Sequence, residues 1–370
     1  MTKIFTPEKI VKYAETRLFG SNVTPEMVRK IELHNGMLPF ALENLLIERY
    51  NGHLKVRQEN GREPIYFMED ILFIPQYSGF GRRKRYETMI KAYLEASGRD
   101  IKFESHELED EQRKTNIEYD NFAYDFVVGL FVPEEKYEDR RVFEGAEAGD
   151  ITEVVFGPVE AVAKQAKVLE QGNSEYLDAQ IVRIDNKRIL NIGYVYADQA
   201  GILIDKMLRE YEALARKKGK KLKIDLYMFG RVGGLEKGMQ RHQLVYPTGI
   251  IDEADLNDKR IGVYPMHNVL AENRRHTGLN FNVSSAIDET VEQLQKAREH
   301  KCICVEMETK ETTISINRAR GRYRGQLDIN FGFIGHVSDL PLQGDTLADE
   351  LDSEEGEQAA VKKIIKAVGG

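Results

Sequence analysis

Apolar and polar positions follow a mostly helical spacing over the first 120 residues of this chain. Two segments, 6–20 and 24–36, begin with Thr-Pro and end at Gly, which is the arrangement of a capped helix. A third helical pattern covers 39–52. A Gly- and Arg-rich loop is expected to open an amphipathic helix within 77–98. Short strands are predicted at 70–76 and 99–105.

After about residue 121 the pattern changes to apolar runs that alternate with amphipathic segments. A strand is predicted at 122–133, a strand followed by a Gly-Pro turn and a helix within 151–172, and a hairpin within 179–197 that turns at Asp185-Asn186. Beyond these we expect helices at 199–219, 288–299, 313–323 and 348–370 and strands at 221–234, 302–306 and 328–339, with a linker over 235–287. Strands that alternate with helices predict an α/β fold with a mixed sheet flanked by helices.

The length of 370 residues and a hydrophobic content of 41% fit two globular domains. We place the boundary where the pattern changes, which gives a helix-rich α+β domain at 1–145 and an α/β domain at 146–370. The formal net charge of −8 argues against general nucleic-acid binding, although a local basic patch can still hold one phosphate.

The sequence contains two cysteines, Cys302 and Cys304, and no long apolar run. The two cysteines have a single residue between them on a likely strand. We therefore expect that their thiols cannot readily form a disulfide. Free thiols and the lack of an apolar leader or membrane span predict a cytoplasmic protein that does not bind membranes. The histidines are scattered along the sequence, so we expect no metal site and no cofactor.

Three predicted strands end in residues that could bind a ligand or take part in a reaction. The strand at 221–234 ends in a Gly-rich segment, 230–234, while the other two end in Glu306-Met307-Glu308 and in Ser338-Asp339. Ligand groups collect at the carboxyl ends of strands in open α/β sheets, so one site could combine all three. A carboxylate can accept bonds from both hydroxyls of a ribose, and a second carboxyl can act as a general acid. The alternative is that these acids are solvated strand ends.

These strand ends resemble the motifs of the nucleoside phosphorylase and nucleosidase superfamily. VEMET at 305–309, HVSDLPLQGD at 336–345 and GRVGGLEKGMQ at 230–240 carry the likeness. It covers roughly residue 151 to the end of the chain and is greatest to the AMP nucleosidases, which also have an extra N-terminal domain. The resemblance implies a nucleoside-phosphorylase-type fold and a homo-oligomer.

The resemblance also implies roles for individual residues. Glu308 would bind the ribose hydroxyls, Met307 would pack against the sugar, and Asp339 would protonate the departing purine. Ser338, Gly230, Arg231 and Gly233 would line the substrate pocket, and Glu306 would either bind the substrate or be structural. Apart from the resemblance, the basic segment 81–85 is either a solvated surface feature or a phosphate site, in which Arg82 or Arg83 would hold a 5′-phosphate.

One departure from the family pattern bears on whether water or phosphate attacks the substrate. Phosphorylases usually have an arginine for phosphate at the place occupied here by Met228, so hydrolysis is favoured over phosphorolysis. Arg231 is a second departure, which could meet a phosphate or block the pocket. The prediction is hydrolysis of a purine nucleotide, with AMP giving adenine and ribose 5-phosphate. The alternatives are a phosphorylase or nucleosidase for unphosphorylated purine nucleosides, and a nucleotide sensor without catalysis.

Overall fold

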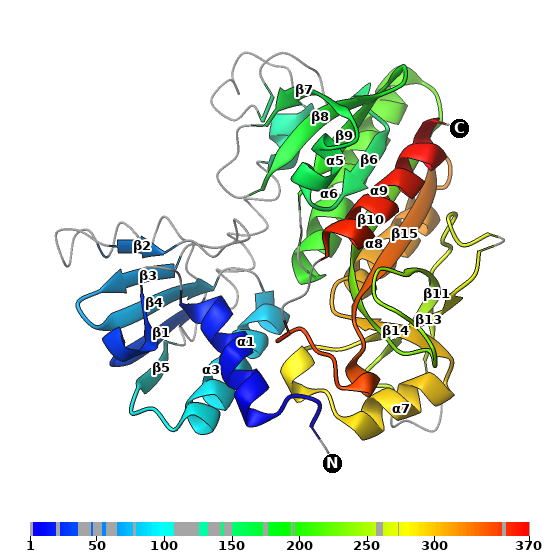
Figure 1. Ribbon diagram of the computed structural model, residues 1–370. Helices are drawn as coiled ribbons and strands as arrows, with labels where there is room; N and C mark the ends of the chain where they lie inside the picture. The colour runs from blue at the N-terminus through cyan, green and yellow to red at the C-terminus, as the bar shows by residue number, and fades with distance from the viewer. Residues whose placement is uncertain are drawn as a thin grey trace. The chain divides into compact units, whose positions relative to one another are not determined.

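Residue contacts divide the chain into two compact units (Figure 1). Unit 1 comprises Met1–Asp120, Ser284–Thr290 and Thr346–Glu350, and unit 2 comprises Asn121–Val283, Val291–Asp345 and Leu351–Gly370. The structure is a computed structural model. It describes residues 3–19, 23–35, 46, 54–56, 65–76, 79–106, 126–131, 142–143, 150–172, 177–193, 195, 197–256, 262–272, 274–349 and 353–369.

Unit 1 contains a five-stranded sheet in the order β2-β3-β4-β1-β5. The strand β1 is parallel to both of its neighbours, while β2, β3 and β4 form an antiparallel meander. Helices α1 and α3 contact each other, and Thr6 caps α1 by accepting a hydrogen bond from the backbone N–H of Lys9. The bounds are α1 Pro7–Leu18, β1 Lys30–Asn35, β2 Leu54–Val56, β3 Ile65–Met68, β4 Ile71–Gln76, α3 Gly79–Ser97 and β5 Lys102–His106.

The helix predicted at 24–36 is wrong. Only Pro25–Met27 forms a helical turn, a short 3₁₀ helix, and β1 follows it. The reason is a period of two: Ile31 and Leu33 are buried and alternate with Glu32 and His34, which is the pattern of a strand and not of a helix. The Gly- and Arg-rich stretch expected as a loop is already helical from the first residue of α3. The helix predicted at 39–52 lies outside the described residues, except for Leu46.

Unit 2 contains a ten-stranded mixed sheet, so the predicted α/β fold with helices flanking a mixed sheet is confirmed. The strand order is β12-β11-β13-β14-β10-β6-β9-β8-β7, and β15 pairs with both β10 and β11. The strand bounds are β6 Glu153–Phe156, β7 Lys167–Gln171, β8 Ala179–Ile184, β9 Lys187–Ile192, β10 Leu222–Gly234, β11 Leu244–Asp252, β12 Tyr264–Pro265, β13 Thr277–Asn282, β14 Cys302–Glu306 and β15 Leu327–Asp339. Helices of unit 2 include α5 Val159–Ala163, α6 Ala197–Lys218, α7 Val291–Glu299, α8 Thr309–Arg322 and α9 Glu354–Gly369.

Several predicted elements of unit 2 need correction. The described part of the strand predicted at 122–133 is helical over 126–131. The helix predicted within 158–172 ends at Ala163 and is followed by β7. The segment predicted as a linker, 235–287, contains three strands of the sheet, β11, β12 and β13. Unit 2 begins at Asn121 and leaves Ser284–Thr290 and Thr346–Glu350 to unit 1, and the division into functional domains at residue 145 stays a prediction.

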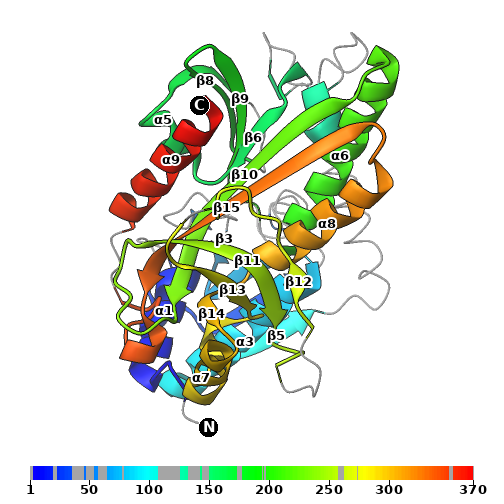
Figure 2. The same ribbon diagram turned by 90° about the vertical axis from the view of Figure 1, so that its right-hand side faces the viewer.

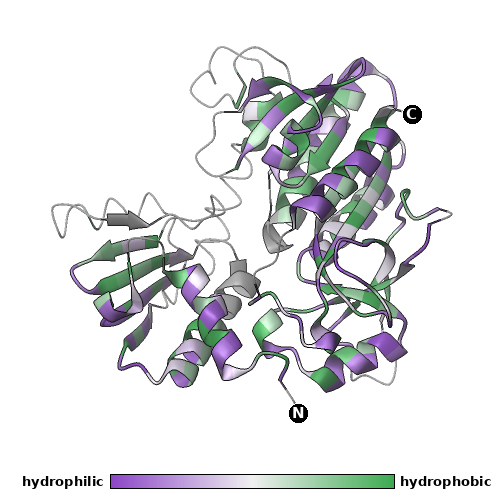
Figure 3. Cartoon of the chain, viewed as in Figure 1, coloured by the Kyte–Doolittle hydropathy of each residue, from purple (hydrophilic) through white to green (hydrophobic). Residues whose placement is uncertain are grey.

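Two long parallel strands, β10 and β15, run side by side through unit 2 (Figure 2). Helix α9 lies on one side of them, and α6 and α8, which pack against each other, lie on the other. Hydrophobic and hydrophilic positions alternate around α9 (Figure 3), so the helix can bury one face and expose the other.

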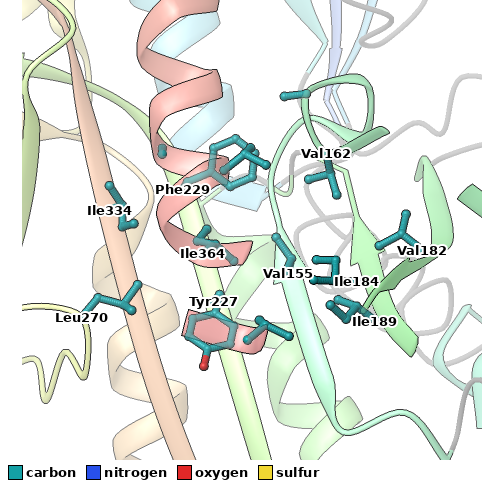
Figure 4. Close-up of a cluster of buried hydrophobic side chains, with 14 of the residues drawn as sticks. Val155, Val162, Val182, Ile184, Ile189, Tyr227, Phe229, Leu270, Ile334 and Ile364 are labelled. Atoms are coloured by element: carbon teal, nitrogen blue, oxygen red, sulfur yellow. The ribbon is translucent and has the colours of Figure 1, made fainter. Parts of the chain in front are cut away.

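One buried cluster joins α9 to the strands (Figure 4). Phe229 and Tyr227 from β10, Val155 from β6 and Ile334 from β15 all contribute side chains, and Ile364 of α9 packs among them. This core fixes the two long strands whose ends carry the predicted site.

Among the described helices, none has the length and apolar character that a membrane span requires.

Candidate active site at the ends of three strands

Gly233 of β10 links the three strand ends that the sequence singled out. Its Cα pairs with Val305 of β14 on one side and with Asp339 of β15 on the other. Neighbouring strands are about 4.8 Å apart, so Val305 and Asp339 lie about 10 Å from each other across one strand. The acidic segment Glu306-Met307-Glu308 follows Val305 directly. The structure therefore brings the Gly-rich segment, the acid pair and the lone acid to one part of the sheet of unit 2.

Glu306, the last residue of β14, is buried and its carboxylate is enclosed by donors. Its Oε2 accepts the backbone N–H of Glu308 at 2.5 Å and that of Thr309 at 2.9 Å. Its Oε1 accepts the hydroxyl of Thr309 at 2.6 Å and the side-chain amide of Asn280. Both oxygens are used within the protein, and two of the donors are backbone groups at the start of α8. The geometry of Glu306 is that of a residue that holds the turn between β14 and α8.

The electrostatics of this turn depend on its burial. Burial, together with the negative charge of Glu308, raises the pKa of Glu306 to about 7, although the hydrogen bonds from Thr309 and the backbone oppose the rise. Burial also raises the pKa of Cys304, whose thiol donates to Oδ1 of Asn280 at 3.4 Å. Cys302 and Cys304 are free, buried thiols.

Glu308 and Met307 form the turn itself and are half-buried. Glu308 immediately precedes α8, and its side chain makes no capping bond to that helix. Its Oε2 accepts the backbone N–H of Met307 at 3.3 Å. Of the two acids, Glu308 is the one whose carboxylate is accessible to a ligand.

Asp339 ends β15 next to a β-bulge. The pairing of β10 with β15 shifts between Val232 and Gly233, so that Ser338 is the extra residue on β15. The Ser338 hydroxyl lies 2.7 Å from Oδ1 of Asp339 and 3.4 Å from the carbonyl oxygen of Val232. Bulges re-aim side chains at the ends of strands, and here the bulge sets the direction of a buried carboxyl group.

The three residues of β10 that were predicted to line the pocket each lie next to another residue of the protein. A Cβ on Gly233 would lie 2.8 Å from Val305 and 3.3 Å from Pro341, so glycine at this position permits close packing. Gly230 pairs with Gly335 of β15. The guanidinium group of Arg231 lies 3.1 Å from the carboxylate of Glu357 on α9. This ion pair gives Arg231 a structural partner, and whether it also meets a substrate stays a prediction.

Arg82 and Arg83 lie in the first turns of α3, in unit 1, and their side chains are outside the described residues. Their predicted contact with a phosphate stays a prediction.

Asn280 and Thr309 lie at the candidate site but were not predicted from the sequence. Asn280 lies in the segment taken for a linker, and its one signal is the period of two in residues 277–282.

No family model matches this sequence, and no curated protein matches it. Among solved structures, uridine phosphorylase from Schistosoma mansoni is similar over 60% of this chain and 88% of its own, with 15% sequence identity and a TM-score of 0.43. Purine nucleoside phosphorylase from Toxoplasma gondii has 17% identity over 59% of this chain and 90% of its own, with a TM-score of 0.43. The 5′-methylthioadenosine/S-adenosylhomocysteine nucleosidase from Neisseria meningitidis has 16% identity over 58% of this chain and 97% of its own, with a TM-score of 0.39.

Proposed function

We propose that this protein hydrolyses the N-glycosidic bond of a purine nucleotide, with AMP as the substrate that fits best. The observation that supports the proposal is the pairing of Gly233 with Val305 on one side and Asp339 on the other. The half-buried carboxylate of Glu308 follows the end of one of the two strands paired with Gly233, and the buried carboxyl group of Asp339 ends the other. The sequence motifs at these positions resemble those of nucleosidases.

Glu308 binds the ribose in this proposal. Its carboxylate is half-buried, and its side chain makes no capping bond to α8. A carboxylate can accept hydrogen bonds from the 2′- and 3′-hydroxyls together, which a single neutral acceptor cannot do as well. Glu306 is a positioning residue, because it holds the backbone N–H of Glu308 and has no oxygen left for a substrate.

Asp339 supplies the proton. As the bond between C1′ of the ribose and N9 of the purine breaks, the protonated carboxyl group of Asp339 gives its proton to N7, and the bonding electrons leave with the base. A water molecule then adds to C1′ and loses a proton to solvent, from which the carboxylate of Asp339 is protonated again. General acid catalysis of this kind contributes about 10²- to 10⁴-fold to a rate. The hydroxyl of Ser338, 2.7 Å from Oδ1, fixes the orientation of the acid.

Water is the proposed nucleophile because β10 offers no obvious phosphate site. Met228 occupies the position at which phosphorylases of the resembled family have an arginine, and Met228 is buried. Arg231, three residues further on, is paired with Glu357.

The test is release of adenine measured by chromatography, with AMP, adenosine and methylthioadenosine as substrates, each with and without phosphate. Release from AMP without phosphate is expected, with a loss of about 10²- to 10⁴-fold in Asp339→Asn and a large loss in Glu308→Gln. Asp328→Asn is the matched control, since Asp328 is an exposed acid at the other end of β15.

Other outcomes identify the alternatives. Turnover only with added phosphate would indicate a phosphorylase, and turnover only of adenosine or methylthioadenosine would indicate a nucleosidase for unphosphorylated substrates. A folded protein that is stabilised by AMP but releases no base would be a nucleotide sensor, because a bound ligand raises the melting temperature without turnover.

A further inference from the structure

Two strands of unit 1 carry the same pattern, Lys-x-Glu-x-His, at 30–34 and 102–106. These strands, β1 and β5, are parallel neighbours, and the two patterns pair in register. Lys30 pairs with Lys102, Glu32 with Glu104, and His34 with His106. Alternate residues of a strand point to one face of its sheet. The six side chains therefore share one face, and the two histidines lie next to each other.

This face of β1 is polar, while the opposite face is core. Ile31 and Leu33 are fully buried, and they alternate with Glu32 and His34. The side chain of Glu32 is only 7% exposed, and those of His34 and His106 are 12% and 41% exposed. The cluster is therefore anchored by a buried carboxylate and opens to solvent at His106.

The three side chains converge on one point. Oε2 of Glu32 lies 3.0 Å from Nε2 of His34 and 3.3 Å from Nε2 of His106. One ligand atom from each residue lies within 4.8 Å of the other two. Around a tetrahedral zinc ion with bonds of about 2.1 Å, ligand atoms are about 3.4 Å apart. The two carboxylate–imidazole distances already have nearly this value.

The surrounding charges hold the cluster in place. Nζ of Lys30 lies 2.5 Å from Oε1 of Glu32 and 2.6 Å from Glu104, which leaves Oε2 of Glu32 facing the two imidazole rings. Those rings are stacked, with centroids 4.7 Å apart. The stacking leaves Nε2 of both rings beside the same carboxylate oxygen of Glu32.

We propose that Glu32, His34 and His106 bind a divalent transition-metal ion. Imidazole nitrogens together with one carboxylate suit Zn²⁺ and its neighbours in the first transition series, whereas Mg²⁺ and Ca²⁺ prefer oxygen ligands. Three protein ligands leave a fourth position for water or another ligand. The site uses no residue of the proposed active site, so it can be tested independently of that proposal.

The experiment is equilibrium dialysis of the full chain, first stripped with a chelator, against Zn²⁺, with metal quantified by mass spectrometry. Binding of Co²⁺, followed by its visible absorption, reports the ligand geometry. We expect one Zn²⁺ per chain and no comparable binding of Mg²⁺. His34→Ala and His106→Ala should each weaken Zn²⁺ binding at least about 100-fold, because outer-shell partners alone contribute 10- to 100-fold.

His276→Asn is the matched control. His276 forms a pair with Glu236 at 2.8 Å, and Glu236 lies in unit 2 outside this cluster. This substitution should leave Zn²⁺ binding unchanged. Because the side chain of His106 is 41% exposed and lies on the polar face of the sheet, His106→Ala should keep the parent far-UV circular dichroism and melting temperature without metal. Absence of Zn²⁺ binding by the parent, or binding that persists when His34 and His106 are both replaced, would overturn the proposal.

Discussion

The backbone N–H of Glu308 donates to Oε2 of Glu306 across 2.5 Å, so one acid of the pair holds the other. The same oxygen accepts the N–H of Thr309, the first residue of α8. Glu306 thus ties the end of a strand to the start of a helix and fixes the turn that presents Glu308. The two acids are two residues apart but differ in their surroundings, because Glu306 is enclosed by four donors and Glu308 accepts one backbone N–H.

Replacing Glu306 by glutamine should destabilise the protein. The amide NH₂ of glutamine would face one of the groups that now donate to the carboxylate, leaving buried donors without an acceptor. We expect the free energy of unfolding to fall by about 2–3 kcal/mol, measured by urea denaturation. Glu299→Gln, at the exposed end of α7, should stay within about 0.5 kcal/mol of the parent. Equal effects of the two substitutions would argue against the role of Glu306 in the turn.

The raised pKa of Glu306 predicts a dependence of stability on pH. The value is about 7 in the folded protein and the ordinary value is 4.5, so the native state holds this proton more tightly than the unfolded chain. Its stabilising contribution is therefore fully present below about pH 4.5 and is lost as the pH rises through about 7. Glu308→Gln removes the neighbouring negative charge and should move this loss to lower pH. Urea denaturation of both proteins between pH 4.5 and 8 checks the shift, and coincident curves would contradict it.

Most elements of unit 2 could be predicted from the sequence because their patterns are local. The apolar runs that form β10 and β15 and the hairpin at Asp185-Asn186 each carry their signal within a few residues. In contrast, β11 and β13 interrupt their apolar runs with polar residues such as Asn280, which is buried and hydrogen-bonded to Glu306. An asparagine inside a strand is typical of a loop when only the sequence is known. The hydrogen bond that allows Asn280 to be buried is made to Glu306, which is distant in the sequence.

The arrangement of the candidate sites depends on strand register, which the sequence does not display. The sequence could predict that Glu308 and Asp339 belong to one site. It could not predict that both strands pair with Gly233, or that a bulge at Ser338 shifts the register of one of them. The histidines appeared scattered for the same reason. His34 and His106 are far apart in the chain and become neighbours only because β1 and β5 pair in parallel.

His336 should remain neutral across the physiological pH range. Burial lowers its pKa to about 3, and the positive charges of Arg231 and His242 contribute in the same direction. Neither of its ring nitrogens makes a hydrogen bond to a described residue, and the nearest carboxylate, that of Glu357, lies 4.0 Å from Nε2. The native state binds this proton less tightly than the unfolded chain. Its contribution to stability is therefore present above about pH 6.5 and is lost as the pH falls toward 3.

Nuclear magnetic resonance can follow the ring of His336 directly. Its imidazole signals, assigned by their loss in His336→Gln, should not shift between pH 5 and 8. A titration with a midpoint between 5.5 and 7.5 would show that the ring takes up a proton in the native state and would contradict the prediction.

Two glycine-to-alanine substitutions should have opposite effects on stability. Gly157 follows β6 with φ +155°, and a Cβ there would lie 2.2 Å from the ring of Phe229, which belongs to the buried cluster. Gly157→Ala must displace that ring and should lower the free energy of unfolding by about 1–3 kcal/mol. Gly321 lies in α8, where a Cβ would meet no described atom within 4 Å.

Gly321→Ala should therefore stabilise the protein by up to about 0.5–1 kcal/mol, because alanine loses less conformational freedom than glycine when a helix forms. Thermal and urea denaturation of the two variants beside the parent measure both effects. If Gly157→Ala were as stable as the parent, Phe229 would have room to move, and the close packing of the turn against β10 would be absent in solution.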